Sequence, residues 1–326
     1  MKKRTLGKSG LQVSEIGLGC WQLGGDFGPV DNQMADAILE AAQNSGIDFW
    51  DTADVYGAGL SESRIERYRF EHFPEAIVAT KVGRSPQLYP DGYSKEKVRA
   101  SIAGSAARLG VRKLDLVQLH CVPPELLKAG DIMDWMEDFR AEGLVGAIGA
   151  SVETLEEALS IVEHPALTSL QIIFNLFRQN AIEELFPAAE KNGVGIIVRL
   201  PLASGVLSGK MNREQKFAES DHRNYNRHGE AFSQGETFSG IPFERALERV
   251  EEMRPWVPAG MSMAQMAMRW ILDYPAVSTV IAGASRPQQV VENAAVSDLA
   301  PLGSELHRKL AEFYRDKVEK EIVVTI

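Results

Sequence analysis

One segment, Phe49-Trp50-Asp51-Thr52-Ala53-Asp54-Val55-Tyr56-Gly57, indicates both the fold and the chemistry. An apolar run ends abruptly at Asp51, and a tyrosine follows five residues later in a glycine-rich loop. A carboxylate at the end of a buried strand costs free energy unless a cation or a hydrogen-bond donor lies beside it. We therefore expect a neighbouring strand to provide a partner for Asp51.

The next two strand-like runs along the chain each end in a residue that suits this role. Residues 77–80 are followed by Lys81, and residues 114–119 are followed by His120. Together with Asp51 and Tyr56, these side chains form a set that is able to protonate a carbonyl oxygen. Taken singly, each has an ordinary alternative: a structural ion pair for the acid and the lysine, a core histidine, and a loop tyrosine.

Outward from this segment, short apolar runs alternate with stretches of helical spacing. The expected strands are 15–19, 47–50, 77–81, 114–119, 145–149, 168–173, 194–199 and 277–281. The expected helices are 31–45, 61–72 with Ser61 as N-cap, 94–109, 131–142 with Asp131 as N-cap, 154–163, 181–192, 242–253, 262–273, 287–295 and 303–319. Such alternation predicts parallel strands joined by crossover helices.

Eight strand–helix units in a chain of 326 residues are typical of an α/β fold of the (β/α)8 TIM-barrel type. The competing doubly wound sheet normally has a Gly-rich dinucleotide fingerprint after its first strand, and residues 17–22 lack the third glycine at the required spacing. We expect a single barrel domain over 1–326, with an N-terminal β-hairpin at 3–14 and extra C-terminal helices. Residues 321–326 are β-prone and have no predicted role.

Bulk composition excludes several classes of partner. A net charge of −10 argues against nucleic acid as a partner. No apolar run reaches the roughly 20 residues of a membrane helix, and the basic N-terminus lacks the apolar region of a signal peptide. Two cysteines form no disulfide framework, which favours a reducing, cytoplasmic location. Metal-ligand spacing is absent, and the amphipathic helices carry no prediction of oligomeric state.

The expected reaction is reduction of a carbonyl, or its reverse. Tyrosine is a weak acid with a pKa of about 10, and a nearby ammonium makes the phenol a better proton donor. Lys81 is expected to supply that charge, Asp51 to hold the lysine in place, and His120 to donate a hydrogen bond to the substrate oxygen.

At these residues the sequence resembles the aldo-keto reductases over nearly its whole length. The shared motifs are Asp-Thr-Ala-x-x-Tyr-Gly at 51–57, Thr-Lys-Val-Gly at 80–83 and Leu-x-x-Leu-His at 116–120. The resemblance is strongest to the bacterial and plant branch that includes the potassium-channel β-subunits. It implies a (β/α)8 barrel, NADPH without a metal, and a catalytic tetrad at Asp51, Tyr56, Lys81 and His120.

The resemblance also implies a cofactor site built from three stretches. Ser151 and Gln171 are expected at the nicotinamide carboxamide, and the loop after strand 194–199 at the pyrophosphate. Ser285 and Arg286 are expected at the adenosine 2'-phosphate, where a positive partner favours NADPH over NADH. The complete expected set is Gly19, Cys20, Trp21, Asp51, Ser151, Gln171, Arg199, Pro201, Leu202, Ala203, Ser204, Gly205, Lys210, Gly283, Ser285, Arg286, Gln289, Glu292 and Asn293.

Two positions depart from the family's pattern. Val152 stands where an asparagine is usual, and Arg199 stands where many members have an aromatic residue. A guanidinium can also stack on the nicotinamide ring, and its positive charge is expected to favour the reduced ring. Either position therefore marks a place where this chain differs from its relatives.

The expected substrate is a small carbonyl compound or a sugar, contacted by Trp21, Tyr56 and His120. The stretch 203–240 is expected to shape the mouth, and its polar part, 211–240, is either a lid that closes over the cofactor or a solvated insertion. Two other functions remain open: a cofactor-retaining sugar epimerase or dehydrogenase, and a redox-sensing partner subunit.

Overall fold

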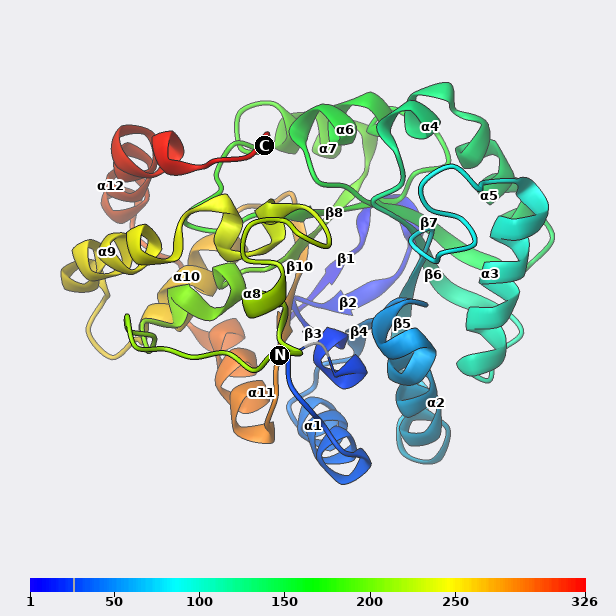
Figure 1. Ribbon diagram of the computed structural model, residues 1–326, viewed down its shortest axis with the longest axis horizontal. Helices are drawn as coiled ribbons and strands as arrows, with labels where there is room; N and C mark the ends of the chain where they lie inside the picture. The colour runs from blue at the N-terminus through cyan, green and yellow to red at the C-terminus, as the bar shows by residue number, and fades with distance from the viewer. Residues whose placement is uncertain (26) are drawn as a thin grey trace.

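The computed structural model describes residues 1–25 and 27–326 and contains a closed barrel of parallel strands surrounded by helices (Figure 1). Around the barrel the strands follow the order β10, β3, β4, β5, β6, β7, β8, β9. Their bounds are β3 Ile16–Gly19, β4 Phe49–Asp51, β5 Ile77–Val82, β6 Leu114–His120, β7 Val145–Ser151, β8 Ser169–Ile173, β9 Gly195–Arg199 and β10 Val277–Gly283. The predicted (β/α)8 fold is confirmed.

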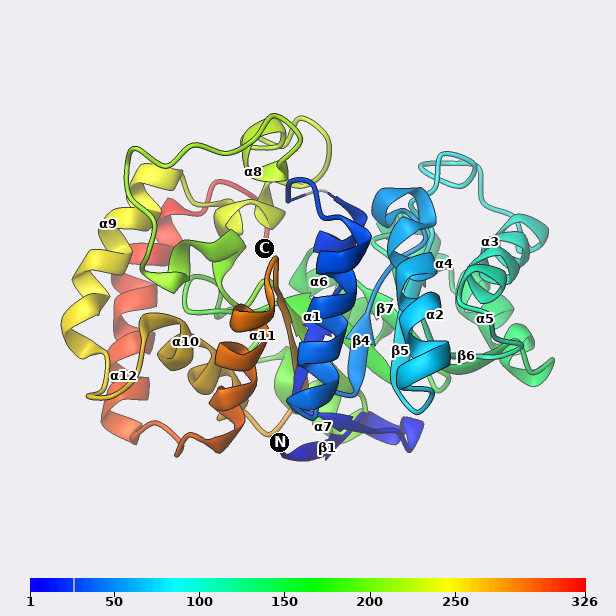
Figure 2. The same ribbon diagram turned by 90° about the horizontal axis from the view of Figure 1, so that it is seen from below.

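Helices pack on the outside of the barrel, where their apolar faces cover the strands. The helices of the described residues are α1 Asn32–Asn44, α2 Leu60–His72, α3 Lys95–Arg108, α4 Pro124–Ala129, α5 Asp131–Ala141, α6 Leu155–Ile161, α7 Leu185–Asn192, α8 His222–Tyr225, α9 Phe243–Met253, α10 Met263–Leu272, α11 Pro287–Ala294 and α12 Ser304–Phe313. The short α8 is an exception, because it lies at an open end of the barrel (Figure 2). Among the residues described, no helix has the length and apolar character needed to span a bilayer.

An antiparallel hairpin of β1 Lys3–Thr5 and β2 Gln12–Ser14 covers the N-terminal end of the barrel, as predicted. Its Leu6 and Val13 are fully buried against inward-facing strand residues such as Phe49. Gly7 has a φ of +49°, and a Cβ there would lie 2.4 Å from the backbone nitrogen of Gly195. Figure 2 shows the hairpin at one end of the barrel and α8 at the other. The hairpin therefore leaves only the opposite end open for a site.

Two predicted helix caps are wrong because the helices begin earlier than expected. α2 follows Gly59, which has a φ of +92°, and Ser61 lies inside the helix with its hydroxyl donating to the carbonyl of Cys20. α5 follows Gly130, whose φ is +85°, so Asp131 is the first helical residue and not the cap. In both cases a glycine in the left-handed region directly precedes the first helical residue, and at α5 this glycine also ends α4.

Three other segments differ from expectation. Of the predicted helix 181–192, only the part that forms α7 is an α-helix. The predicted helix 303–319 is α-helical as far as Phe313, where α12 ends, and continues as a π-helix over Tyr314–Val318. The β-prone end of the chain forms no strand, although the amide of Val323 donates to the carbonyl of Gly240 at 2.9 Å. This contact brings the C-terminal end to the long 203–240 stretch.

The register of the strands sets the positions of their last residues. Gly19 pairs with Asp51 and with Gly283, while Ser151 pairs with both His120 and Gln171. Gln171 lies in the middle of β8, and the other five are the last residues of their strands, where the loops of a barrel carry its chemistry. The predicted site residues therefore lie around one opening.

Candidate active site

The centre of the opening holds a chain of hydrogen bonds from a carboxylate to a phenol. The ammonium of Lys81 donates to Asp51 Oδ1 at 2.5 Å, to the Thr52 carbonyl at 2.9 Å and to Tyr56 Oη at 3.1 Å. An ammonium has three hydrogens, so these contacts use all of them. Because the lysine can only donate, the hydroxyl hydrogen of Tyr56 is left to point elsewhere.

The second oxygen of Asp51 is held from the opposite side of the barrel. Gln118 Nε2 donates to Asp51 Oδ2 at 2.9 Å, and Gln171 Nε2 donates to the same atom at 2.8 Å. Gln171 was expected to face a carboxamide, but its amide nitrogen is already used in this way. Gln118 was missed, although it lies two residues before His120 in an apolar strand and so points to the same side.

Burial and charge act in opposite directions on the pKa values of this chain. Burial is the largest single influence on Lys81 and would lower its pKa, but the charge of Asp51 together with Tyr56 and the hydrogen bonds to both raises the pKa overall, so the lysine is an ammonium. Burial raises the pKa of Tyr56 to about 12, and the Lys81 charge opposes that rise. The charge of Lys81 therefore offsets only part of the rise that burial causes in the pKa of Tyr56. Tyr56 is a neutral phenol that is able to donate a proton.

His120 lies edge-on to the Tyr56 ring, with 5.9 Å between ring centroids. Burial, followed by the charges of Lys81, Arg84 and Arg199, holds the pKa of His120 well below its usual value. The imidazole is therefore neutral and has one N–H to donate. Its buried Nδ1 has no hydrogen-bond partner within the described residues.

Aromatic side chains form one wall of the mouth. Trp21 stacks on Tyr56 with 5.7 Å between the rings and contacts Phe27 at 5.1 Å. His222 and Phe232, both from the 203–240 stretch, lie 4.8 and 5.9 Å from the Trp21 ring. The predicted position of Trp21 at the mouth agrees with this arrangement. The contributions of Phe27 and Phe232 were missed, because no local pattern distinguishes them from other loop aromatics.

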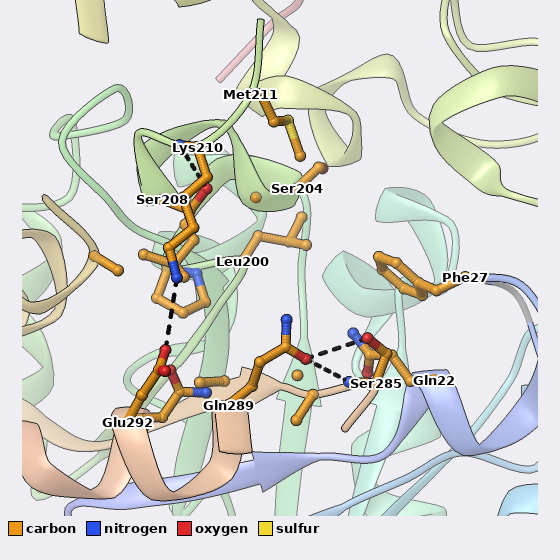
Figure 3. A pocket seen from close by; sticks show the side chains of 18 of the residues that line it. Gln22, Phe27, Leu200, Ser204, Ser208, Lys210, Met211, Ser285, Gln289 and Glu292 are labelled. Atoms are coloured by element: carbon orange, nitrogen blue, oxygen red, sulfur yellow. Dashed lines mark hydrogen bonds and ion pairs between the residues drawn. The ribbon is translucent and has the colours of Figure 1, made fainter. Parts of the chain in front are cut away.

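A long groove of about 650 Å³ leads away from this mouth (Figure 3). A smaller cavity of about 80 Å³ in front of Tyr56 joins it, and Gln22, Phe27 and Gly283 are among the residues that line both. Predicted cofactor residues in the groove are Pro201, Leu202, Ser204, Gly205, Lys210, Gly283, Ser285, Arg286, Gln289, Glu292 and Asn293. Those in the cavity are Gly19, Cys20, Trp21, Asp51, Gln171, Arg199, Pro201 and Gly283.

Two members of the predicted set lie outside these spaces. Ser151 is 2% exposed, and its hydroxyl lies 3.8 Å from the thiol of Cys121. Ala203 is fully buried in the turn that follows β9. Neither lines the groove or the cavity.

The groove has the features that a long phosphorylated ligand needs. Lys210 and Glu292 face each other across it at 3.7 Å, and the Ser285 hydroxyl and amide bond to Gln289 (Figure 3). Arg286 is exposed and has no ion-pair partner among the residues described. A Cβ on Gly283 would lie 2.0 Å from the side-chain amide of Gln22, so a larger residue there would have to displace that side chain at the junction of the groove and the cavity. These residues fit a nicotinamide dinucleotide.

The two cysteines are packing residues. Burial raises the pKa of Cys121 to about 12 and raises that of Cys20 even further. Both are therefore protonated thiols at neutral pH, and a thiol is a weak nucleophile.

We expect Gln118→Met to lower the free energy of unfolding by about 1–3 kcal/mol, because the buried Asp51 carboxylate loses a hydrogen-bond donor. The matched control is Gln12→Met on the exposed hairpin, where Nε2 donates to Thr5 Oγ1. This control should change stability by less than about 0.5 kcal/mol. Urea unfolding of both variants provides the measurement, and equal losses would contradict the role given to Gln118.

The chain matches known proteins along most of its length. A model of the aldo/keto reductase family matches residues 15–315. A probable voltage-gated potassium channel subunit beta from rice is 29% identical and the NADH-specific methylglyoxal reductase of Escherichia coli is 27% identical. The alignment with the rice protein covers 93% of this chain and 93% of that protein. The alignment with the Escherichia coli reductase covers 96% of this chain and 99% of that protein. The structure of a glycerol dehydrogenase from Gluconobacter oxydans superposes with a TM-score of 0.78 at 26% identity, covering 100% of this chain and 97% of the other. The chain therefore belongs to the aldo/keto reductase family.

Proposed function

We propose that this oxidoreductase reduces aldehydes and ketones to alcohols with NADPH, and that Tyr56 is the general acid. The main support for this proposal is the contact of 3.1 Å between the ammonium of Lys81 and the phenol oxygen of Tyr56. Tyr56 lines a small cavity that joins the long groove. A phenol whose own hydrogen is free and whose oxygen is held by an ammonium is suited to donate a proton to a substrate oxygen.

Asp51 acts through the lysine and does not meet the substrate oxygen. Its carboxylate keeps Lys81 charged and fixed, and it is itself fixed by Gln118 and Gln171. When Tyr56 gives up its proton, the lysine stabilises the phenolate that forms. Neutral His120 would donate its N–H to the same substrate oxygen, which binds the negative charge that develops there.

NADPH, when bound, supplies the hydride for the reduction. The groove residues would hold its phosphates: Lys210 and the backbone of the Ser204–Gly205 turn at the pyrophosphate, and Arg286 with Ser285 at the 2'-phosphate. Gly283 would allow the chain to approach closely at the junction with the cavity. The aromatic wall of Trp21 and Phe27 would exclude water from the carbonyl.

Tyr56→Phe tests the acid directly. We expect the variant to lose about 10²–10⁴-fold in kcat/KM for 4-nitrobenzaldehyde with NADPH, because the proton donor is gone. Its dissociation constant for NADPH should stay near that of the wild type. The control is Tyr89→Phe, which changes an exposed tyrosine and should retain full activity. Activity that survives the loss of the Tyr56 hydroxyl would disprove its role.

Arg286→Gln tests the choice of cofactor. We expect about a tenfold rise in KM for NADPH and little change for NADH, because only NADPH carries the 2'-phosphate that an arginine pairs with. Arg112→Gln, at an exposed position away from the groove, is the control. The family includes an NADH-specific relative, so equal use of both cofactors by the wild-type protein would contradict this part of the proposal.

A second candidate is favoured by the rice relative, which is named a probable channel subunit. A redox-sensing partner subunit would bind the cofactor and turn over every carbonyl slowly. A cofactor-retaining sugar epimerase or dehydrogenase would keep its cofactor through purification. A panel of carbonyl substrates, measured with NADPH and with NADH, separates both from an ordinary reductase.

A further inference from the structure

Arg199 lies at the end of β9, and its side chain lines the same small cavity as Tyr56. Its guanidinium is buried and held by two oxygen contacts: Nη1 lies 3.0 Å from Glu236 Oε1, and Nη2 donates to the Val152 carbonyl at 3.0 Å. Nη2 also lies 3.9 Å from the thiol of Cys121. The charge of Arg199 is therefore paired at the place where it enters the cavity.

The partner carboxylate comes from the 203–240 stretch and also lines the cavity. The backbone around Glu236 is fixed by Ser204, whose hydroxyl donates to the Glu236 carbonyl at 2.9 Å and accepts from the Phe238 amide at 3.2 Å. Asn175, after β8, donates to the Ser239 hydroxyl at 2.9 Å. Glu236 is thus held toward the cavity from both sides and is not a loosely placed surface acid.

Other charged and polar groups surround this pair. Cys121, Glu153 and Glu236 present ligand atoms within 4.8 Å of one another, which is a spacing that a metal could also use. Arg199 contacts two of the three, however, and Arg84 lies 3.5 Å from Glu153. Arg178, which is buried and donates to the Glu153 carbonyl at 2.9 Å, adds a third guanidinium to these two carboxylates, so Glu236 is the direct counter-charge of Arg199 in a cluster with an excess of cations. The guanidinium of Arg199 is a cation that already contacts Cys121 and Glu236, so we interpret these side chains as partners of Arg199 and not as metal ligands.

We propose that Glu236 sets the relative affinity of the protein for oxidised and reduced cofactor by neutralising Arg199 next to the nicotinamide. This inference rests on the proposed function. An oxidised nicotinamide ring carries a positive charge and a reduced ring carries none. An unpaired guanidinium at its side would disfavour the oxidised ring, whereas the Arg199–Glu236 pair leaves both forms acceptable. The pair would thereby allow alcohol oxidation as well as carbonyl reduction.

The test is a double-mutant cycle read as the ratio of two dissociation constants, that of NADP⁺ divided by that of NADPH. Glu236→Gln leaves Arg199 unpaired, so we expect the ratio to rise by about tenfold, the size expected for a unit charge at this range. Arg199→Gln leaves Glu236 unpaired and should lower the ratio. The double variant should return to within about threefold of the wild type.

Quenching of tryptophan fluorescence gives both constants without any turnover. A purely structural disturbance weakens both cofactors together and leaves their ratio unchanged, so the ratio isolates the charge. Glu230→Gln, an exposed acid on the same stretch, should not move the ratio. Arg199→Lys keeps the positive charge, so the ratio should stay within about twofold of the wild-type value. If Glu236→Gln does not fold, the ratios of Arg199→Lys and Arg199→Gln are compared instead.

An unchanged ratio in folded Glu236→Gln would overturn this inference and leave the reductase proposal intact. The same holds if Arg199→Gln and Arg199→Lys give equal ratios. Failure of the wild-type protein to bind either nicotinamide cofactor would instead disprove the proposed function. The two proposals can therefore fail separately.

Discussion

The buried ion pair between Asp51 and Lys81 is the interaction on which the site depends. Two charges removed from water cost several kcal/mol each unless each is fully satisfied. Here the ammonium has three acceptors, and the carboxylate has three donors from three different strands. Those strands are β5, β6 and β8. Such a set comes together only when the barrel closes, so closing the barrel and assembling the site depend on the same contacts.

The two ends of the barrel serve different purposes. At one end the hairpin fills the interior with apolar residues, and Gly7 permits an approach to the strands that no larger residue allows. At the other end polar side chains replace the apolar ones, and the 203–240 stretch adds aromatic residues and Glu236. Part of this stretch therefore lies at the mouth, where Phe232 and His222 contact the Trp21 ring.

Much of this arrangement could be predicted from the sequence, and the reason is physical. Strand ends in a barrel meet at one opening, so an acid, a lysine and a histidine that each end an apolar run are brought together by topology alone. Contacts that cross the barrel are different, because no local pattern encodes them. Gln118 and Gln171 both turn to Asp51, and Glu236 reaches Arg199 from 37 positions away in the sequence. Ser61 and Asp131 illustrate the same limit, since nearby glycines took over the helix starts that their side chains suggested.

We propose that Tyr56, held by Lys81 and edge-on to a neutral His120, delivers the proton to the substrate. The pKa of Tyr56 is about 12 and that of His120 lies well below its usual value, so neither group changes its charge between about pH 7 and pH 9. The most direct measurement is the pH dependence of kcat/KM for 4-nitrobenzaldehyde reduction, with NADPH held at saturation. A flat profile across that window is the predicted result. A fall approaching tenfold per pH unit inside it would show that another group delivers the proton.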